Sequence, residues 1–204
     1  MADTWTADLW VDPSCPYSRL TARWLMEAVQ VRPISLRWHV MSLAVLNEGR
    51  DDDPEGDPEG YLWIPARICA AVQTEHGHDA LGRFYDALWE SRERGGEDWV
   101  AGFEEVLAGA GLPADLARAG FSEAYDAALR ASHDEGFGLV GGDVGTPVLA
   151  ATAPDGTRAA VFGPVVSEVP RGESAGRLWD GTVLVAATPG FHTLQGPPQA
   201  QIAG

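Results

Sequence analysis

The sequence predicts an α/β fold in which a β-α-β unit and a later β-β-α unit are separated by an all-helical insertion. Short alternating apolar segments, typical of strands, occur near the two ends of the chain. The middle of the chain instead repeats its apolar residues at helical spacing. With 204 residues, 45% of them hydrophobic, the chain is long enough to bury a sizeable core.

The first unit begins at residues 6–12, where small or polar residues alternate with apolar ones and predict a strand that ends in a turn at Asp12. A helix is predicted from Pro16 through Val29, because apolar residues recur at helical spacing and proline suits the first turn. Residues 34–40 alternate again and predict the second strand.

An acidic stretch rich in proline and glycine, residues 51–60, predicts a surface loop at a domain junction. The helices predicted after it cover residues 63–75, 80–94 and 99–109, a short segment from Pro113, and residues 122–136. Two short apolar runs follow, residues 147–151 and 159–162, joined by a Pro-Asp-Gly turn that predicts an antiparallel hairpin, and then a last helix at residues 172–187. We therefore expect a helical subdomain over residues 60–138 and a second domain formed by residues 1–50 and 140–204.

Composition excludes several classes of function. Thirty acidic residues against 14 basic ones give a formal charge of −16, which disfavours nucleic acid and anionic membrane surfaces as partners. No segment approaches the roughly 18 to 20 apolar residues of a membrane span, and the N-terminus lacks a signal-peptide pattern, so we expect a cytoplasmic protein. The two cysteines, Cys15 and Cys69, are too far apart in sequence for a typical zinc motif, and no glycine-rich phosphate loop predicts a flavin.

Cys15 is the residue from which we expect chemistry. It precedes a predicted helix, where unpaired amides and the helix dipole favour the thiolate and lower the pKa of a cysteine. The turn at residues 12–14 predicts that Cys15 lies at an exposed strand-to-helix junction. Ser18, three residues further on, is predicted to donate its hydroxyl hydrogen bond to the Cys15 sulfur.

Other candidate residues each allow a structural interpretation. Cys69 lies on an apolar helical face and is expected to be a core residue. His39 ends the second strand and is either a base that tunes Cys15 or a structural residue. Tyr17 either stacks on a substrate or packs against neighbouring side chains of the protein. His133, beside two acidic residues, is expected to be solvated, and no metal is expected at His76 and His78, which lack a convincing third ligand.

Several motifs taken together identify a family resemblance. They are DPSCPYS at residues 12–18, TARW at 21–24, HVMSLAVLNE at 39–48, DVGTP at 143–147, FGPV at 162–165, PRGE at 170–173 and LWD at 178–180. As a set they resemble the DsbA-like, mycothiol-dependent nitroreductases and disulfide reductases of actinobacteria over roughly residues 5–192. A lone Cys-Pro-x-Ser motif would be a weak signal.

The resemblance implies a thioredoxin fold interrupted by a helical subdomain, a homodimer, and mycothiol as the reducing thiol. It makes Cys15 the nucleophile, with Pro16 and Tyr17 of the same motif beside it at the thiol-binding site. It also implies that Thr146-Pro147 carries a cis-proline next to the cysteine, and that Asn47 belongs to the ligand pocket.

One position departs from the family pattern. Ser18 stands where the resemblance implies a second, resolving cysteine, so Cys15 is expected to act as a monothiol whose adduct is released by a second small thiol. The predicted function is a mycothiol-dependent monothiol oxidoreductase that reduces a mixed disulfide or a small nitro-aromatic or quinone-like electrophile.

Two alternatives remain open at the level of sequence. The Pro-Tyr-Ser segment also resembles kappa-class glutathione transferases and hydroxychromene-carboxylate isomerases, in which a serine at the position of Cys15 helps to hold a cofactor thiol. A non-catalytic thiol-binding protein is the other alternative, and it predicts an ordinary cysteine pKa of about 8.5.

Overall fold

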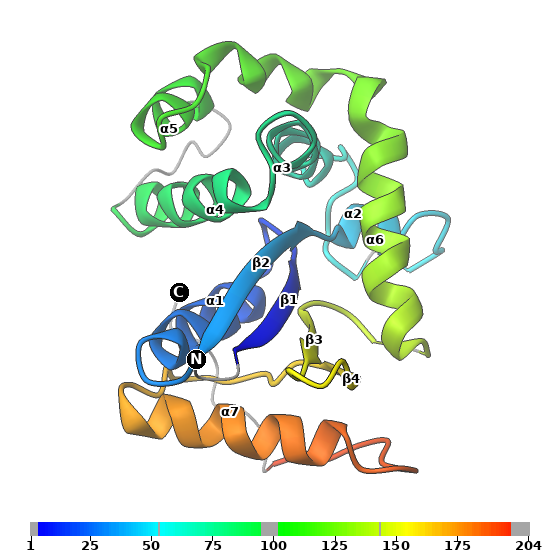
Figure 1. The fold of residues 1–204 in the computed structure, drawn as a ribbon. Coiled ribbons are helices and arrows are strands. Elements are labelled where there is room, and N and C mark those ends of the chain that lie inside the picture. The colour runs from blue at the N-terminus through cyan, green and yellow to red at the C-terminus, as the bar shows by residue number, and fades with distance from the viewer. Residues whose placement is uncertain (1–3, 53, 95–101, 143, 197–204) are drawn as a thin grey trace.

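The computed structural model describes residues 4–52, 54–94, 102–142 and 144–196. It contains a four-stranded sheet with the order β2-β1-β3-β4 (Figure 1). β1 pairs in parallel with β2 and antiparallel with β3, and β4 pairs antiparallel with β3. The strands are β1 (Trp5–Val11), β2 (Ile34–Val40), β3 (Val148–Thr152) and β4 (Arg158–Phe162). β1 is thus an interior strand, which explains why its last five residues are all buried.

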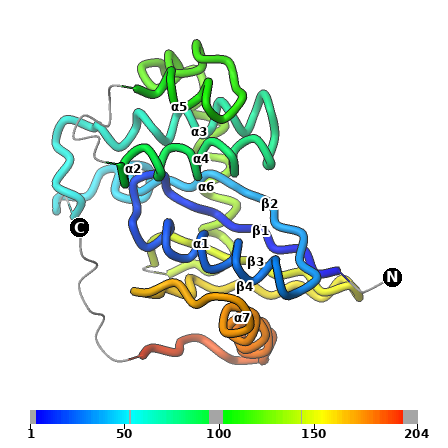
Figure 2. The backbone as a smooth tube through the Cα atoms, turned by 90° about the vertical axis from the view of Figure 1, so that its left-hand side faces the viewer, coloured from blue at the N-terminus to red at the C-terminus, as the bar shows by residue number. Residues whose placement is uncertain are grey.

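Helices lie on both sides of this sheet. α1 (Pro16–Val29) connects β1 to β2 and packs against α7 (Glu173–Ala186), which follows β4. Figures 1 and 2 show α3, α4 and α5 gathered beyond the β2 edge of the sheet, with α4 next to α1. The elements between β2 and β3 are α2 (Leu43–Leu46), α3 (Trp63–His76), α4 (His78–Glu93), α5 (Phe103–Gly109), the 3₁₀ helices η1 (Ala114–Phe121) and η2 (Glu123–Tyr125), and α6 (Asp126–Val140). The predicted β-α-β and β-β-α units, separated by helices, are therefore confirmed.

The structure corrects several element boundaries. α2 was absent from the sequence prediction because four residues are too few to show a helical period. The helix predicted at 99–109 begins at Phe103, and residues 99–101 lie outside the described part of the chain. The helix predicted from Ser122 begins at Asp126, because the Ser122 hydroxyl instead caps η2 by accepting from the Ala124 amide.

Buried tryptophans position α1 and α6. The indole N–H of Trp24 on α1 donates to the Ala175 carbonyl of α7 at 3.1 Å. On the other side of the sheet, α6 approaches β1 so closely that a Cβ added at Gly136 would lie 2.6 Å from Trp10 Cγ. A glycine is therefore required where α6 crosses β1, and α6 covers the sheet as well as packing on α3.

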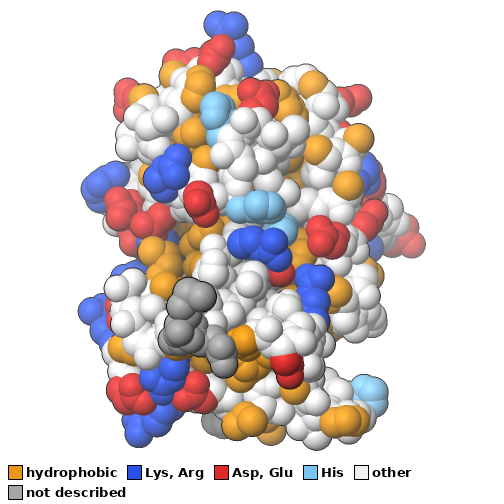
Figure 3. Space-filling view, viewed as in Figure 1, with side chains coloured by type: hydrophobic (Ala, Val, Ile, Leu, Met, Phe, Trp, Pro, Cys, Tyr) orange, Lys and Arg blue, Asp and Glu red, His pale blue; other side chains and the backbone are white. Residues whose placement is uncertain are grey.

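Within the described ranges, no helix combines the length and the apolar character needed to cross a membrane. Acidic, basic and apolar side chains are interspersed over the face shown in Figure 3.

Candidate active site

Cys15 lies at the junction between β1 and α1, as its N-cap residue. The backbone amide of Ser18 donates to the Cys15 sulfur at 3.5 Å, which confirms that the sulfur lies at the N-terminus of the helix. On its other side, the thiol donates to the carbonyl oxygen of Thr146 at 3.8 Å. The residue is only 6% exposed, so the prediction of an exposed junction is wrong.

Burial also reverses the predicted direction of the Cys15 pKa. Loss of hydration raises the pKa of the Cys15 thiol, and the nearby charge of Asp12 raises it further. The hydrogen bonds that Cys15 forms with Thr146 and Ser18 favour a lower pKa but do not offset this burial. The sequence correctly predicted the helix N-terminus, and it could not show how completely water is removed from the thiol.

Ser18 and Thr146 form the second part of the site. The Ser18 hydroxyl donates to Thr146 Oγ1 at 3.0 Å. The Ser18 side chain also interacts with the Cys15 sulfur and favours a lower Cys15 pKa, in the predicted direction. The peptide bond between Thr146 and Pro147 is cis. Thr146 thus contacts both Cys15 and Ser18, and it joins the start of α1 to the loop before β3.

Pro16 and Tyr17 continue the motif on the first turn of α1. Pro16 is exposed and Tyr17 is half-buried. Their side chains therefore reach the surface next to a thiol that is itself buried.

Sequence reasoning missed the part played by Asp12 and α4. Asp12 is fully buried, and its carboxylate accepts from the amides of Ser14 at 2.5 Å and Leu43 at 2.7 Å. From α4, the Tyr85 hydroxyl donates to the Asp12 carbonyl at 3.5 Å, and Arg92 donates to the Pro13 carbonyl at 2.8 Å. Burial raises the pKa of Asp12 to about 6, against the lowering effect of its amide donors and Arg92. The only sequence signal was its position three residues before Cys15.

His39 has contacts of a different kind. Its Nε2 lies 3.0 Å from Asp8 Oδ1, and its ring stacks on Trp10 with centroids 4.3 Å apart. A second ring, that of His78, lies 4.4 Å away. Arg37 also pairs with Asp8, at 2.8 Å. These contacts support the structural interpretation of His39, because none of them is with Cys15.

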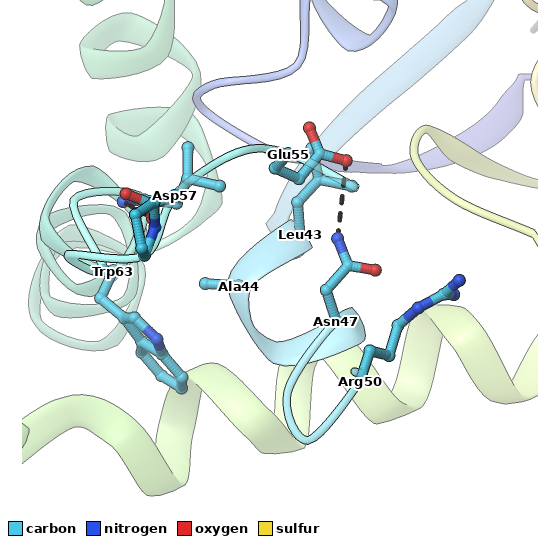
Figure 4. Close-up of a pocket in the computed structure, with 10 residues that line it drawn as sticks. Leu43, Ala44, Asn47, Arg50, Glu55, Asp57 and Trp63 are labelled. Atoms are coloured by element: carbon cyan, nitrogen blue, oxygen red, sulfur yellow. Dashed lines mark hydrogen bonds between the residues drawn. The ribbon is translucent and has the colours of Figure 1, made fainter. Parts of the chain in front are cut away.

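Asn47 lies at the C-terminal end of α2, in a pocket of about 280 Å³ (Figure 4). Its amide nitrogen is 3.5 Å from Glu55 Oε1. The lining combines an aromatic ring with charged and amide groups from α2 and the following loop: Leu43, Ala44, Asn47, Arg50, Glu55, Asp57, Pro58, Gly60, Leu62 and Trp63. Cys15 is not part of the lining, but Asp12 connects its loop to Leu43, the first residue of α2.

The structure confirms the predicted environment of Cys69 and corrects that of His133. Cys69 is buried on α3, and burial raises its pKa strongly, which confirms the expected core position. His133 is also buried, and its Nδ1 accepts from the Ser42 amide at 3.3 Å, so the expectation of a solvated histidine is wrong. Its pKa is lowered by burial. Over the described residues, no group of three or more His, Cys, Asp or Glu side chains could hold a metal ion.

A cysteine at the start of α1, held against a cis-proline loop of the same sheet, defines a thiol-dependent oxidoreductase with a DsbA-like thioredoxin fold. A family model described as mycothiol-dependent nitroreductase Rv2466c matches residues 14–196. The chain therefore belongs to this Rv2466c-like family, whose thiol co-substrate is mycothiol.

Individual proteins are also similar to this chain, and those of known structure agree with the fold. The chain is 29% identical over 198 residues to the uncharacterized protein Rv2286c of Mycobacterium tuberculosis strain H37Rv, covering 94% of this chain and 82% of that protein. The cytosolic disulfide reductase DsbM from Pseudomonas aeruginosa superposes with a TM-score of 0.52 at 18% identity, covering 89% of this chain and 100% of DsbM. A Nitrosomonas europaea protein named provisionally as a protein disulfide isomerase gives a TM-score of 0.56 at 13% identity, covering 89% and 98% of the two chains.

Proposed function

We propose that this chain is a monothiol oxidoreductase that uses Cys15 and mycothiol to reduce a mixed disulfide or a small electrophile. The observation that carries the proposal is the pairing of Cys15 with Ser18, a hydroxyl residue, at the start of α1. Cys69, the other cysteine of the chain, is buried on α3. A disulfide within the motif is therefore impossible, and a second small thiol has to release any adduct formed on Cys15.

The proposed cycle has two exchange steps. The Cys15 thiolate attacks the mycothiol sulfur of a mixed disulfide, which forms a disulfide between Cys15 and mycothiol and releases the substrate as a thiolate that takes up a proton. A second mycothiol thiolate then attacks the mycothiol sulfur of this adduct. The products are mycothiol disulfide and free Cys15. With a nitro-aromatic or quinone-like acceptor, two free mycothiols are oxidised to mycothiol disulfide, and the acceptor takes up the two electrons and two protons that they release.

The pocket beside α2 supports the thiol-binding part of the proposal. Asn47, Glu55 and Asp57 present amide and carboxylate groups, and Trp63 offers an aromatic face. This combination suits the hydroxyl-rich sugar and inositol rings of mycothiol. We assign Asn47 to mycothiol binding, with Tyr17, Pro16, Thr146 and Pro147 around the thiol itself.

A transferase or isomerase of kappa-class type is the second candidate, and the Cys15 pKa favours it. Burial raises the pKa of Cys15 and so favours its thiol form, which can donate a hydrogen bond to a bound thiolate. In that cycle Cys15 never forms a covalent adduct.

Intact mass spectrometry after incubation with mycothiol disulfide separates the two candidates. The proposal expects one mycothiol adduct, removed by free mycothiol, absent from Cys15→Ala and retained by Cys69→Ala. Tight binding of mycothiol without an adduct would support the transferase or isomerase. If Asn47→Ala binds mycothiol more weakly and any adduct still forms on Cys15, the result would support the role of the pocket in mycothiol binding.

The cytoplasmic location and the homodimer belong to the proposal as well, and size-exclusion chromatography with light scattering tests the dimer.

A further inference from the structure

Asp12 is placed to control the loop that carries Cys15. One carboxylate oxygen accepts from the amide of Ser14, the residue before Cys15, and the other accepts from the amide of Leu43 at the start of α2. The Asp12 carbonyl accepts from the Cys15 amide at 3.3 Å. One fully buried residue therefore holds the thiol loop against the helix whose other end carries Asn47.

The charge of Asp12 is confined to a small buried region. It interacts electrostatically with Cys15, with Tyr85 and Arg92 of α4, and with Cys69 of α3. Arg92 is the cationic group of this set and partly compensates the carboxylate. Because water is excluded, a negative charge on Asp12 acts strongly on Cys15 and opposes a second negative charge there.

We propose that Asp12 is a positioning residue for the reaction of Cys15: its carboxylate fixes the thiol loop against α2, and its negative charge restrains ionisation of the thiol. The proposal rests on the proposed function only in taking Cys15 as the reacting group. It assigns no contact with substrate to Asp12.

The wild-type protein itself provides the first test. The rate of Cys15 alkylation by iodoacetamide is measured from pH 5 to pH 10, with peptide mass spectrometry to separate Cys15 from Cys69. Since burial raises the pKa of Asp12 to about 6, the logarithm of the rate is expected to climb, to flatten near pH 6 as Asp12 ionises, and to climb again. A straight rise with unit slope through this region would overturn the electrostatic part of the proposal.

Asp12→Asn provides the second test. Asparagine removes the charge and leaves one oxygen to accept from Ser14 or Leu43, so the inflection near pH 6 should vanish and alkylation at pH 7 should become roughly threefold faster or more. Asp8→Asn is the matched control: Asp8 is also buried on β1 but lies roughly 13 Å further back along the strand, and this variant should keep the wild-type profile.

The outcomes also separate this inference from the proposed function. A profile that changes in Asp12→Asn, in a protein without a mycothiol adduct, would support Asp12 and contradict the oxidoreductase. A mycothiol adduct on Cys15, together with identical pH profiles of alkylation in wild type and Asp12→Asn, would support the oxidoreductase and contradict the role of Asp12. Circular dichroism shows whether Asp12→Asn is folded, and if it is not, the wild-type profile decides.

Discussion

At the scale of single residues, the Ser18 side chain decides whether the site can close a disulfide by itself. We predict that Ser18→Cys, after mild oxidation, loses the mass of two hydrogens in an internal disulfide with Cys15. The Ser18 amide is already 3.5 Å from the Cys15 sulfur, so the two side chains start from the same turn of α1. The expected mycothiol adduct should correspondingly disappear.

Intact mass spectrometry with and without a reductant checks this result. Ser18→Ala is the control, since it removes the hydrogen bond to Thr146 Oγ1 without adding a thiol. If Ser18→Cys retains a stable mycothiol adduct and forms no disulfide, the monothiol character does not depend on this residue.

Asp12 should also affect the pH dependence of stability. Its folded pKa of about 6 exceeds the ordinary value of 3.8, so the folded protein binds this proton more tightly than the unfolded chain. The resulting stabilisation is complete below pH 4 and is lost as the pH rises through 6. Relative to wild type, Asp12→Asn should therefore gain roughly 2–3 kcal/mol between pH 4 and pH 7.

Urea unfolding at the two pH values measures this difference. Asp155→Asn is a suitable comparison, because hydrogen bonds from Thr157 lower the pKa of this exposed carboxyl and its contribution has the opposite sign. A stability difference between Asp12→Asn and wild type that is the same at pH 4 and pH 7 would contradict the raised pKa.

The residue scale also shows the limits of sequence reasoning. Cys15 could be predicted at the start of a helix because the turn and the helical pattern are local. Its burial could not, because it involves Thr146, 131 residues away, and α4, which contacts the loop before Cys15. The same long-range packing makes Asp12 a buried carboxylate and His133 a buried hydrogen-bond acceptor.

At the scale of elements, α1 is fixed to α4 by a buried arginine. Arg19 Nη1 lies 2.5 Å from Asp86, and Arg19 Nε lies 3.2 Å from Glu93. The Arg19 side chain is 7% exposed, whereas its partners are 33% and 45% exposed. Arg19→Met should therefore destabilise the protein by about 2 kcal/mol, less than a fully buried pair, because the two acids can turn towards water.

Thermal and urea unfolding measure this effect, and Arg23→Met is the matched control. Arg23 belongs to the same helix and lies 3.6 Å from Glu93, but it is 41% exposed and should change stability by less than about 0.5 kcal/mol. Equal effects of the two substitutions would show that the burial of Arg19 contributes nothing.

Helices and strands could be predicted from the sequence where they are long enough to show a regular hydrophobic period. β1, α1 and β2 could be predicted because their alternating or helical patterns run for seven residues or more. α2 could not, although it carries Asn47, because its four residues are stabilised by the Ser42 cap and by Asp12 rather than by a pattern of their own. The start of α6 was misplaced because Ser122 caps the short η2 instead.

At the scale of the whole molecule, the helices between β2 and β3 do more than lengthen the chain. α3 and α4 pack on β2, and α4 also supplies Tyr85 and Arg92 to the loop before Cys15. The thiol is therefore enclosed by both halves of the fold. The motif at residues 12–18 predicts the site, but the site also depends on side chains that α4 supplies from the middle of the chain.

The net charge of the molecule should select among thiol reagents. A formal charge of −16, with acidic side chains spread over faces such as that in Figure 3, repels anions that approach Cys15. The dianionic disulfide DTNB should therefore react several-fold faster when ionic strength rises from about 10 mM to about 150 mM, because the screening length falls from roughly 30 Å to 8 Å. The uncharged 4,4′-dithiodipyridine should react at the same rate in both buffers.

Stopped-flow absorbance with the Cys69→Ala protein measures both rates. An equal salt response of the two reagents would mean that local packing around Cys15, rather than the electrostatic field of the molecule, limits its reaction. A repulsive field of this kind favours neutral thiols such as mycothiol over anionic ones such as glutathione, which connects the composition of the chain to the co-substrate of its family.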